Sequence, residues 1–261
     1  MRIEEKFKRL KEEKKKAFIV YIPFGFPKIS YTKDLIFSLQ NVGIDLIELG
    51  IPFSEPLADG PIIQKATDIA LKNGATVGKM FRFLKEIRGY LKIPLLIMTY
   101  YNPLFRFGVS DFFKKLKNLG FSSTMVVDLP FEESKNYLKE AKKIDLETVF
   151  FITPTTSFSR AKEIVKVSKG FIYYISVTGI TGPKEFNYQP LRKHINILKK
   201  ITNLPICVGF GIHHPQQVKE INKFSDGVIV GSCVIKFIEN NYKKNNFLKK
   251  LIEYTKWLKG N

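Results

Sequence analysis

Residues 45–73 read DLIELGIPFSEPLADGPIIQKATDIALKN, and this stretch holds one complete strand–loop–helix unit. Asp45–Leu49 is a short run rich in Leu and Ile, which is typical of a buried strand. Residues 62–73 repeat apolar side chains at helical spacing, and the Asn-Gly pair at their end is a common helix C-terminus. The stretch therefore predicts a strand, a loop rich in carboxylates and prolines, and a helix.

Similar units recur along the whole chain of 261 residues. Helix-like segments separate short apolar runs, and this alternation predicts a parallel sheet with both faces covered. Eight units indicate an α/β fold of the (β/α)8 TIM-barrel type, with a doubly wound open sheet as the alternative. The eight expected strands are Phe18–Ile22, Asp45–Leu49, Leu95–Met98, Thr124–Asp128, Thr148–Ile152, Phe171–Ser176, Ile206–Val208 and Gly227–Val230.

An extra helix is expected ahead of the first strand. Residues 2–11 place Ile3, Phe7 and Leu10 at helical spacing, so this helix is expected to plug the N-terminal end of the barrel. We see no linker or low-complexity segment, and we therefore expect a single domain over residues 1–261.

Local signals also predict several helix ends. Ser110 is expected to cap a helix that ends at Gly120, and Pro190 is expected in the first turn of a later helix. Asp59 precedes Gly-Pro, so one interpretation makes it the N-cap of the helix over 62–73.

The composition is strongly basic, with 43 Lys and Arg against 24 Asp and Glu and a formal net charge of +19. The lysines are spread over most expected helices, which favours a solvated basic surface; binding to a polyanion is the alternative. A positive field would also attract a phosphorylated substrate.

The sequence shows no apolar run long enough for a membrane helix and no secretory signal. Cys207 and Cys233 lie in apolar, β-like runs, and two cysteines are too few for a disulfide framework. These features predict a reducing compartment, the cytoplasm or a plastid stroma, and neither a membrane nor a nucleic acid is expected as a partner.

Glu48 is a carboxylate inside a strand otherwise made of Leu and Ile. Alternation places Leu46 and Glu48 on one face of the strand. If that face is the barrel interior, desolvation raises the pKa of Glu48 towards neutrality, as a general acid and base requires. The alternative is that Glu48 pairs with a lysine outside the barrel.

Glycine-bearing segments follow the sixth, seventh and eighth expected strands, at residues 176–182, 209–212 and 231–232. Glycine allows backbone N–H groups to approach an anion, and barrels commonly bind phosphate after strands seven and eight. The segments therefore indicate a phosphate site, with ordinary turn geometry as the alternative.

The stretch IELGIPFSEPLADGPIIQKA, residues 47–66, closely resembles the signature of tryptophan synthase α chains. The resemblance implies that Glu48 donates and accepts the proton and that Asp59 binds the indole N–H. The family usually has Asp where this chain has Glu55, at a loop position that faces a partner subunit.

The resemblance extends over almost the whole chain and implies further roles. It places Thr181 near Asp59 when the site closes, and it puts Tyr21 where a Phe is more usual. Phe26 likewise replaces a frequent Asp. The implied substrate-binding residues are Tyr21, Met98, Tyr100, Tyr173, Thr181 and Phe210, and the implied phosphate-binding residues are Gly182, Gly211, Gly231 and Ser232. Core packing is the alternative for each aromatic residue.

The family acts as an α2β2 complex, so the resemblance implies a β-subunit partner. Glu55, Pro56, Asn102 and Pro130 are expected at that interface. The pyridoxal phosphate (PLP) belongs to the partner, and no cofactor is expected in this chain. No metal site is expected either, because the three histidines lack a ligand cluster with suitable spacing.

The expected activity is therefore that of a lyase of tryptophan biosynthesis. It cleaves indole-3-glycerol phosphate to indole and glyceraldehyde 3-phosphate by a retro-aldol reaction. The alternatives are another phosphate-binding barrel such as a sugar-phosphate isomerase, a non-catalytic subunit that activates a PLP-dependent partner, and a polyanion-binding protein.

Overall fold

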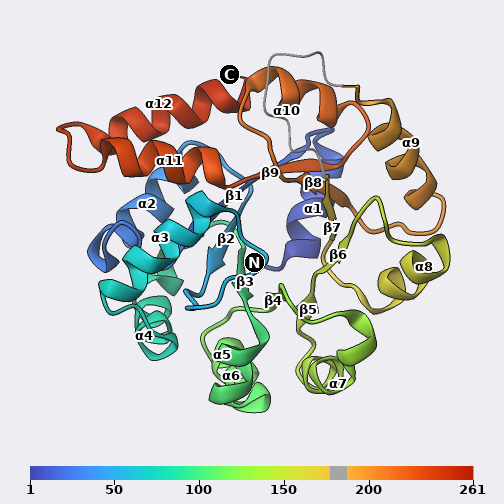
Figure 1. Ribbon diagram of the computed structural model, residues 1–261, viewed down its shortest axis with the longest axis horizontal. Helices are drawn as coiled ribbons and strands as arrows, with labels where there is room; N and C mark the ends of the chain where they lie inside the picture. The colour runs from blue at the N-terminus through green and yellow to red at the C-terminus, as the bar shows by residue number, and fades with distance from the viewer. Residues whose placement is uncertain (177–186, 261) are drawn as a thin grey trace.

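The computed structural model describes residues 1–176 and 187–260, which form a ring of parallel strands surrounded by helices (Figure 1). Neighbouring strands follow one another in chain order around the ring, and β1 pairs with β9. The strands of the described residues are β1 (Ala17–Pro23), β2 (Leu46–Gly50), β3 (Leu95–Thr99), β4 (Ser123–Val126), β5 (Glu147–Thr148), β6 (Phe150–Ile152), β7 (Ile172–Ile175), β8 (Ile206–Gly209) and β9 (Gly227–Val230).

The strands β5 and β6 are the two halves of the fifth expected strand. β5 pairs with β4, β6 pairs with β7, and a single residue, Val149, separates the halves. The N–H of Val149 donates to the carbonyl of Thr124 at 3.1 Å, so the chain itself closes the ring. The (β/α)8 barrel is confirmed, and the open-sheet alternative is wrong.

Helices follow the strands and cover the outside of the ring. Their apolar faces, together with the outward side chains of the strands, make the larger of two buried clusters. The described helices are α1 (Ile3–Glu12), α2 (Ile29–Asn41), α3 (Pro61–Lys72), α4 (Val77–Ile87), α5 (Tyr101–Phe107), α6 (Val109–Asn118), α7 (Lys135–Lys143), α8 (Phe158–Val167), α9 (Gln189–Leu198), α10 (Pro215–Asn222), α11 (Ser232–Asn241) and α12 (Phe247–Lys259), with short 3₁₀ turns at Arg88–Tyr90 and Phe131–Glu133. None of these helices is long and apolar enough to cross a membrane.

Two local predictions were wrong. Ser110 lies inside the first turn of α6, and the N-cap is Gly108, whose φ of +89° glycine adopts without the steric cost that a side chain brings. Cys233 lies in α11 rather than in a strand, because the strand β9 already ends at Val230. Pro190 does lie in the first turn of α9, as expected.

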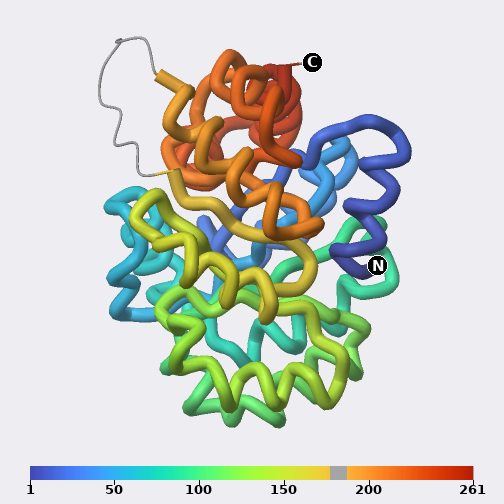
Figure 2. Tube along the Cα trace, turned by 90° about the vertical axis from the view of Figure 1, so that its right-hand side faces the viewer, coloured from blue at the N-terminus to red at the C-terminus, as the bar shows by residue number. Residues whose placement is uncertain are grey.

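The smaller buried cluster fills the barrel interior, and α1 closes one end of it. Ile3, Phe7 and Leu10 belong to this cluster, and the rings of Phe7 and Phe171 lie 5.7 Å apart. Phe171 directly precedes β7, so α1 covers the N-terminal end of the barrel, as the sequence predicted. Figure 2 shows α1, in dark blue, at one end of the molecule. Because the strands are parallel, their C-terminal ends together form the opposite mouth.

Candidate active site at the C-terminal mouth of the barrel

Glu48 lies in the middle of β2 and points into the barrel. Leu46, two residues earlier, belongs to the interior cluster, whereas Ile47 and Leu49 belong to the outer one. The Glu48 side chain is only 1% exposed, and its Oε1 has no hydrogen-bond partner among the described residues. Burial raises the pKa of this carboxyl from 4.5 to about 8. No described lysine pairs with Glu48, so the alternative of an ion pair outside the barrel is wrong.

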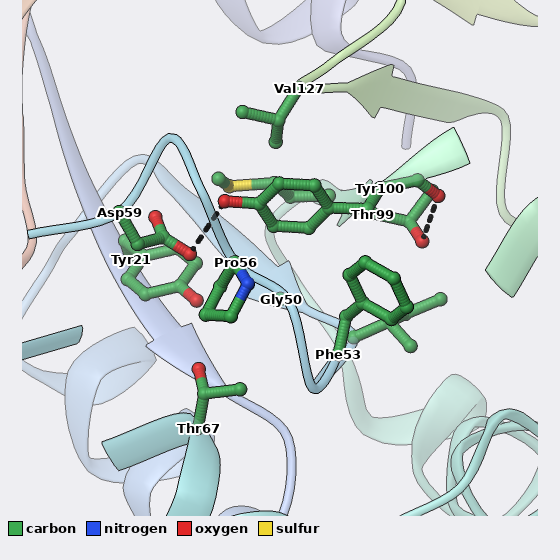
Figure 3. A pocket seen from close by; sticks show the side chains of 11 residues that line it. Tyr21, Gly50, Phe53, Pro56, Asp59, Thr67, Thr99, Tyr100 and Val127 are labelled. Carbon is green, nitrogen blue, oxygen red and sulfur yellow. Dashed lines mark hydrogen bonds between the residues drawn. The ribbon is translucent and has the colours of Figure 1, made fainter. Parts of the chain in front are cut away.

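Asp59 lies on the loop between β2 and α3 and turns back over the mouth. Its Oδ2 accepts a hydrogen bond of 3.1 Å from the hydroxyl of Tyr100, which in turn accepts one from the N–H of Ala58 at 3.1 Å (Figure 3). Burial raises the pKa of Asp59 to about 6, and the bond from Tyr100 opposes that rise. The N-cap of α3 is Gly60, so the interpretation of Asp59 as a helix cap is wrong.

A small cavity lies beside Asp59 at the ends of β1, β2 and β3. Its volume is about 10 Å³, which is roughly the space that one water molecule needs. An indole ring is larger, so part of the lining must shift before a ligand enters. The lining consists of Tyr21, Gly50, Ile51, Phe53, Pro56, Asp59, Thr67, Met98, Thr99, Tyr100 and Val127. Tyr21, Met98 and Tyr100 are thus placed together beside Asp59.

Two glycines at strand ends make room for tyrosines in the mouth. A side chain at Gly50 would collide with the hydroxyl of Tyr21, and one at Gly209 would collide with the hydroxyl of Tyr173. The sequence argument missed Gly50, although a glycine that ends a barrel strand beside a catalytic candidate signals a close approach. Tyr173 is partly buried, and Glu48 is the charged group that most strongly raises its pKa after burial.

The residues expected to bind phosphate are only partly described. Gly211 follows β8, while Gly231 and Ser232 connect β9 to the N-terminus of α11, and β8 and β9 are neighbours in the sheet. Thr181 and Gly182 lie outside the described residues. Phe210 was expected to line the indole pocket, but it is 51% exposed, with a φ of +86°, and does not line the cavity.

The expected interface positions differ in exposure. Glu55, Asn102 and Pro130 are exposed, whereas Pro56 is buried and faces the cavity (Figure 3). Sequence reasoning missed two strongly exposed apolar side chains close by. These are Leu57, 89% exposed on the loop after β2, and Phe105, 64% exposed on α5. Their signal in the sequence is a large apolar residue in a segment that directly follows a strand, at a position next to the residue that fills the core.

Among the described residues, no cluster of three or more His, Cys, Asp or Glu could hold a metal ion. The geometry instead brings together a buried carboxyl whose pKa is near 8 and a second carboxyl whose pKa is near 6. Both lie at the C-terminal mouth of a (β/α)8 barrel. This arrangement defines a barrel enzyme that works by proton transfer.

The comparisons with known proteins name the particular enzyme family. The chain belongs to the tryptophan synthase alpha chain family, whose model matches residues 7–260. The tryptophan synthase alpha chain of Petrotoga mobilis is 42% identical over 245 residues, covering 94% of this chain and 95% of that one. The alpha chain of Arabidopsis thaliana is 40% identical over 259 residues, covering 99% and 94%. The resemblance drawn from residues 47–66 is therefore confirmed.

Solved structures agree with the sequence relatives. The crystal structure of tryptophan synthase subunit alpha from Legionella pneumophila superposes with a TM-score of 0.91 at 31% identity, covering 98% of this chain and 97% of that one. A crystal structure of tryptophan synthase from M. tuberculosis gives a TM-score of 0.88 at 28% identity, covering 99% and 97%. The barrel is thus shared over its full length.

Proposed function

We propose that this chain cleaves indole-3-glycerol phosphate to indole and glyceraldehyde 3-phosphate, the α reaction of tryptophan synthase in L-tryptophan biosynthesis. One domain over residues 1–261 carries this activity. The observation that supports it most directly is the isolated carboxyl of Glu48. It is buried, it lacks a hydrogen-bond partner for Oε1 among the described residues, and its pKa is near 8. At neutral pH it is therefore a protonated acid, and it lies on β2, whose C-terminal residue Gly50 lines the cavity.

In the proposed reaction, the carboxyl of Glu48 transfers its proton to C3 of the indole ring. The ring then carries a positive charge shared with N1–H, and the carboxylate of Asp59 stabilises that charge by accepting a hydrogen bond from N1–H. The Glu48 carboxylate next removes the proton from the hydroxyl on the adjacent side-chain carbon. The bond between this carbon and C3 breaks, its electron pair returns to the ring, and indole and the aldehyde are released.

The phosphate-binding residues are proposed to anchor the substrate at a point far from the bond that breaks. Gly211, Gly231 and Ser232 supply backbone N–H groups and a hydroxyl at the ends of two adjacent strands, and Gly182 is proposed as a further N–H donor. Anchoring by the phosphate contributes orientation rather than chemistry. The overall positive charge of the chain favours the encounter with this anion.

We further propose that the chain assembles with a tryptophan synthase β subunit, which carries PLP, in an α2β2 complex. The exposed Leu57 and Phe105 support this proposal, because both belong to segments that follow strands, the loop after β2 and the helix α5 after β3, as do the exposed Glu55 and Asn102. Exposed apolar side chains that lie together at one end of a molecule mark an interaction site. A cytoplasmic location belongs to the same proposal, with the plastid stroma as the alternative in a plant cell.

The deciding experiment measures indole release from indole-3-glycerol phosphate by the purified chain, alone and with a β subunit. We expect release in both cases and loss of at least roughly a thousandfold in Glu48→Gln, with substrate binding largely retained. Asp59→Asn is expected to lose indole release to a similar extent, because the substitution removes the negative charge that stabilises the positively charged ring. Full activity of Glu48→Gln would refute the assignment of the proton donor.

The same experiment separates the competing functions. A chain that only activates the β subunit would raise the β activity and release no indole. A polyanion-binding protein would bind nucleic acid in a salt-dependent manner and release no indole either.

A further inference from the structure

Two tyrosine hydroxyls in the barrel mouth differ from the other buried tyrosine hydroxyls. Those of Tyr100, Tyr137 and Tyr174 all take part in hydrogen bonds. The hydroxyls of Tyr21 and Tyr173 have no hydrogen-bond partner among the described residues. Neither hydroxyl is among the fully buried atoms that lack a partner, so each can still be reached by a ligand or by a neighbouring group when the site rearranges.

The position of Tyr21 is set by rigid structure on two sides. Its backbone lies in β1 directly opposite Glu48 of β2, and its hydroxyl lies over Gly50, two residues further along β2. Gly231 at the end of β9 lies against its Cβ. Tyr21 is therefore fixed by the strands around it, whereas Asp59 lies outside the sheet, on the loop between β2 and α3.

Asp59 still has unused hydrogen-bonding capacity. A carboxylate has about four acceptor positions, and in this structure the described residues occupy one, through the Tyr100 hydroxyl on Oδ2. Under the proposed function the indole N–H takes a second. Substrate binding also excludes water from the carboxylate, so the ionised form that the reaction needs becomes harder to maintain unless another donor replaces that water.

We propose that Tyr21 is a positioning residue for Asp59: in the substrate complex its hydroxyl donates a hydrogen bond to the Asp59 carboxylate and holds it ionised and oriented. This inference rests on the proposed function of the site. Figure 3 shows the Tyr21 ring and the Asp59 carboxylate on the same side of the cavity, with Tyr100 across from them. Tyr21 belongs to β1 and Tyr100 directly follows β3, so these two tyrosines approach Asp59 from different parts of the barrel.

The electrostatics of the mouth agree with this pairing. Burial raises the pKa of Tyr21 well above its usual value, so the hydroxyl stays a neutral donor, and Asp59 then acts on it more strongly than Glu48 does. For Tyr173 the order is reversed, with Glu48 ahead of Asp59. The remaining titratable groups that act on these residues are Tyr100, beside Asp59, and Cys207, which interacts with Glu48.

The test compares the pH profiles of kcat and kcat/KM for the full chain and its Tyr21→Phe variant, with indole-3-glycerol phosphate as substrate. Removing a donor to ionised Asp59 raises its pKa in the complex, so the acid limb of kcat is expected to move up by roughly half to one pH unit. At pH 6, kcat is expected to fall up to roughly tenfold. The acid limb of kcat/KM, which reports the free enzyme, is expected to stay in place, because the hydroxyl is unpaired there.

Tyr173→Phe is the matched control, since it removes a second unpaired hydroxyl from the same mouth. Its acid limb of kcat is expected to remain at the wild-type position. Melting temperatures exclude a folding defect, because a purely structural effect would lower stability without moving one limb alone. An unchanged acid limb in Tyr21→Phe would overturn this inference and leave the proposed function intact. A wild-type chain that releases no indole would overturn both.

Discussion

At the scale of single residues, the protonation state of each carboxyl in the site depends on how far it is buried and on its hydrogen bonds. Glu48 is enclosed by strands and keeps its proton at neutral pH, whereas Asp59 is reached from the loop side and receives a hydrogen bond from Tyr100. Two carboxyls of one strand–loop segment therefore acquire different protonation states at neutral pH. This difference allows one to act as an acid while the other acts as an anion.

The pH dependence of kcat/KM follows from the pKa values of Asp59 and Glu48. Asp59 must be ionised, so activity rises as the pH increases through about 6, and Glu48 must be protonated, so activity falls as the pH increases through about 8. We expect a bell-shaped profile with a maximum near pH 7, reported as the two apparent pKa values of the pair. Steady-state kinetics of indole release from pH 5 to 9.5 measure it. A profile that keeps rising beyond pH 9 would contradict Glu48 as the acid.

Glu48 also makes stability depend on pH. Its pKa is raised on folding from 4.5 to about 8, so between these values the unfolded chain ionises while the folded chain keeps the proton. The contribution to stability is therefore lost as the pH rises from about 4.5 to about 8, by roughly 1.4 kcal/mol per unit. We expect the free energy of unfolding of Glu48→Gln to rise relative to that of the wild type by about this amount for each pH unit. Urea unfolding at pH 5.5, 6.5 and 7.5 measures this difference. A constant difference across this range would show that the carboxyl is hydrated in the folded chain.

At the scale of secondary-structure elements, α1 is anchored to the barrel by a carboxylate from another element. Glu147 of β5 accepts hydrogen bonds from the N–H groups of Ile3 at 3.0 Å and Glu4 at 2.9 Å. These are first-turn donors of α1 that have no partner within the helix. A buried carboxylate at a helix N-terminus satisfies the donors and also interacts favourably with the helix dipole.

We expect Glu147→Ala to destabilise the chain by about 2–3 kcal/mol, because two donors lose a charged acceptor and α1 loses its anchor. Urea unfolding at neutral pH provides the measurement. Glu163→Ala is the control, since its carboxylate is exposed and pairs with Lys166 on the same helix. Equal destabilisation of the two variants would mean that the contacts of Glu147 do not hold α1.

At the scale of the whole molecule, the barrel separates stability from function at its two ends. The N-terminal end is closed by α1 and its apolar residues Ile3, Phe7 and Leu10. The C-terminal end carries the cavity and the exposed Leu57 and Phe105. A partner that docks at this mouth covers the loop bearing Asp59, so assembly and catalysis are expected to be coupled.

The double variant Leu57→Ser, Phe105→Ser is expected to weaken binding of the β subunit by roughly tenfold or more, since two buried apolar anchors are lost from the complex. Analytical ultracentrifugation or titration calorimetry measures the affinity. Tyr90→Ser is the control, because Tyr90 is 67% exposed but lies before β3, at the opposite end of the barrel. An unchanged affinity in the double variant would place the interface elsewhere.

Local patterns in the sequence predicted the barrel, because each strand is a short apolar run, and alternation placed Leu46 and Glu48 on one face of their strand. Which face points into the barrel was left open by the sequence, and the interior position of Leu46 decided it. The helix α1 was likewise predicted from three apolar residues at helical spacing. The division of the fifth strand at Val149 was not, because it depends on pairing with two separate neighbours.

The contacts of the site depended on the tertiary structure. Asp59 looked like a helix cap until the structure placed Tyr100, 41 residues away, within 3.1 Å of its carboxylate. Phe210 was expected in the pocket; it is 51% exposed and is not among the residues that line the small cavity. The sequence by itself determined which residues form strands and which side chains share a face of each strand, since these are local properties. Only the closed barrel decided which face points inward, which hydroxyl meets Asp59 and which glycines make room for tyrosines, because such contacts join segments that are distant in the chain.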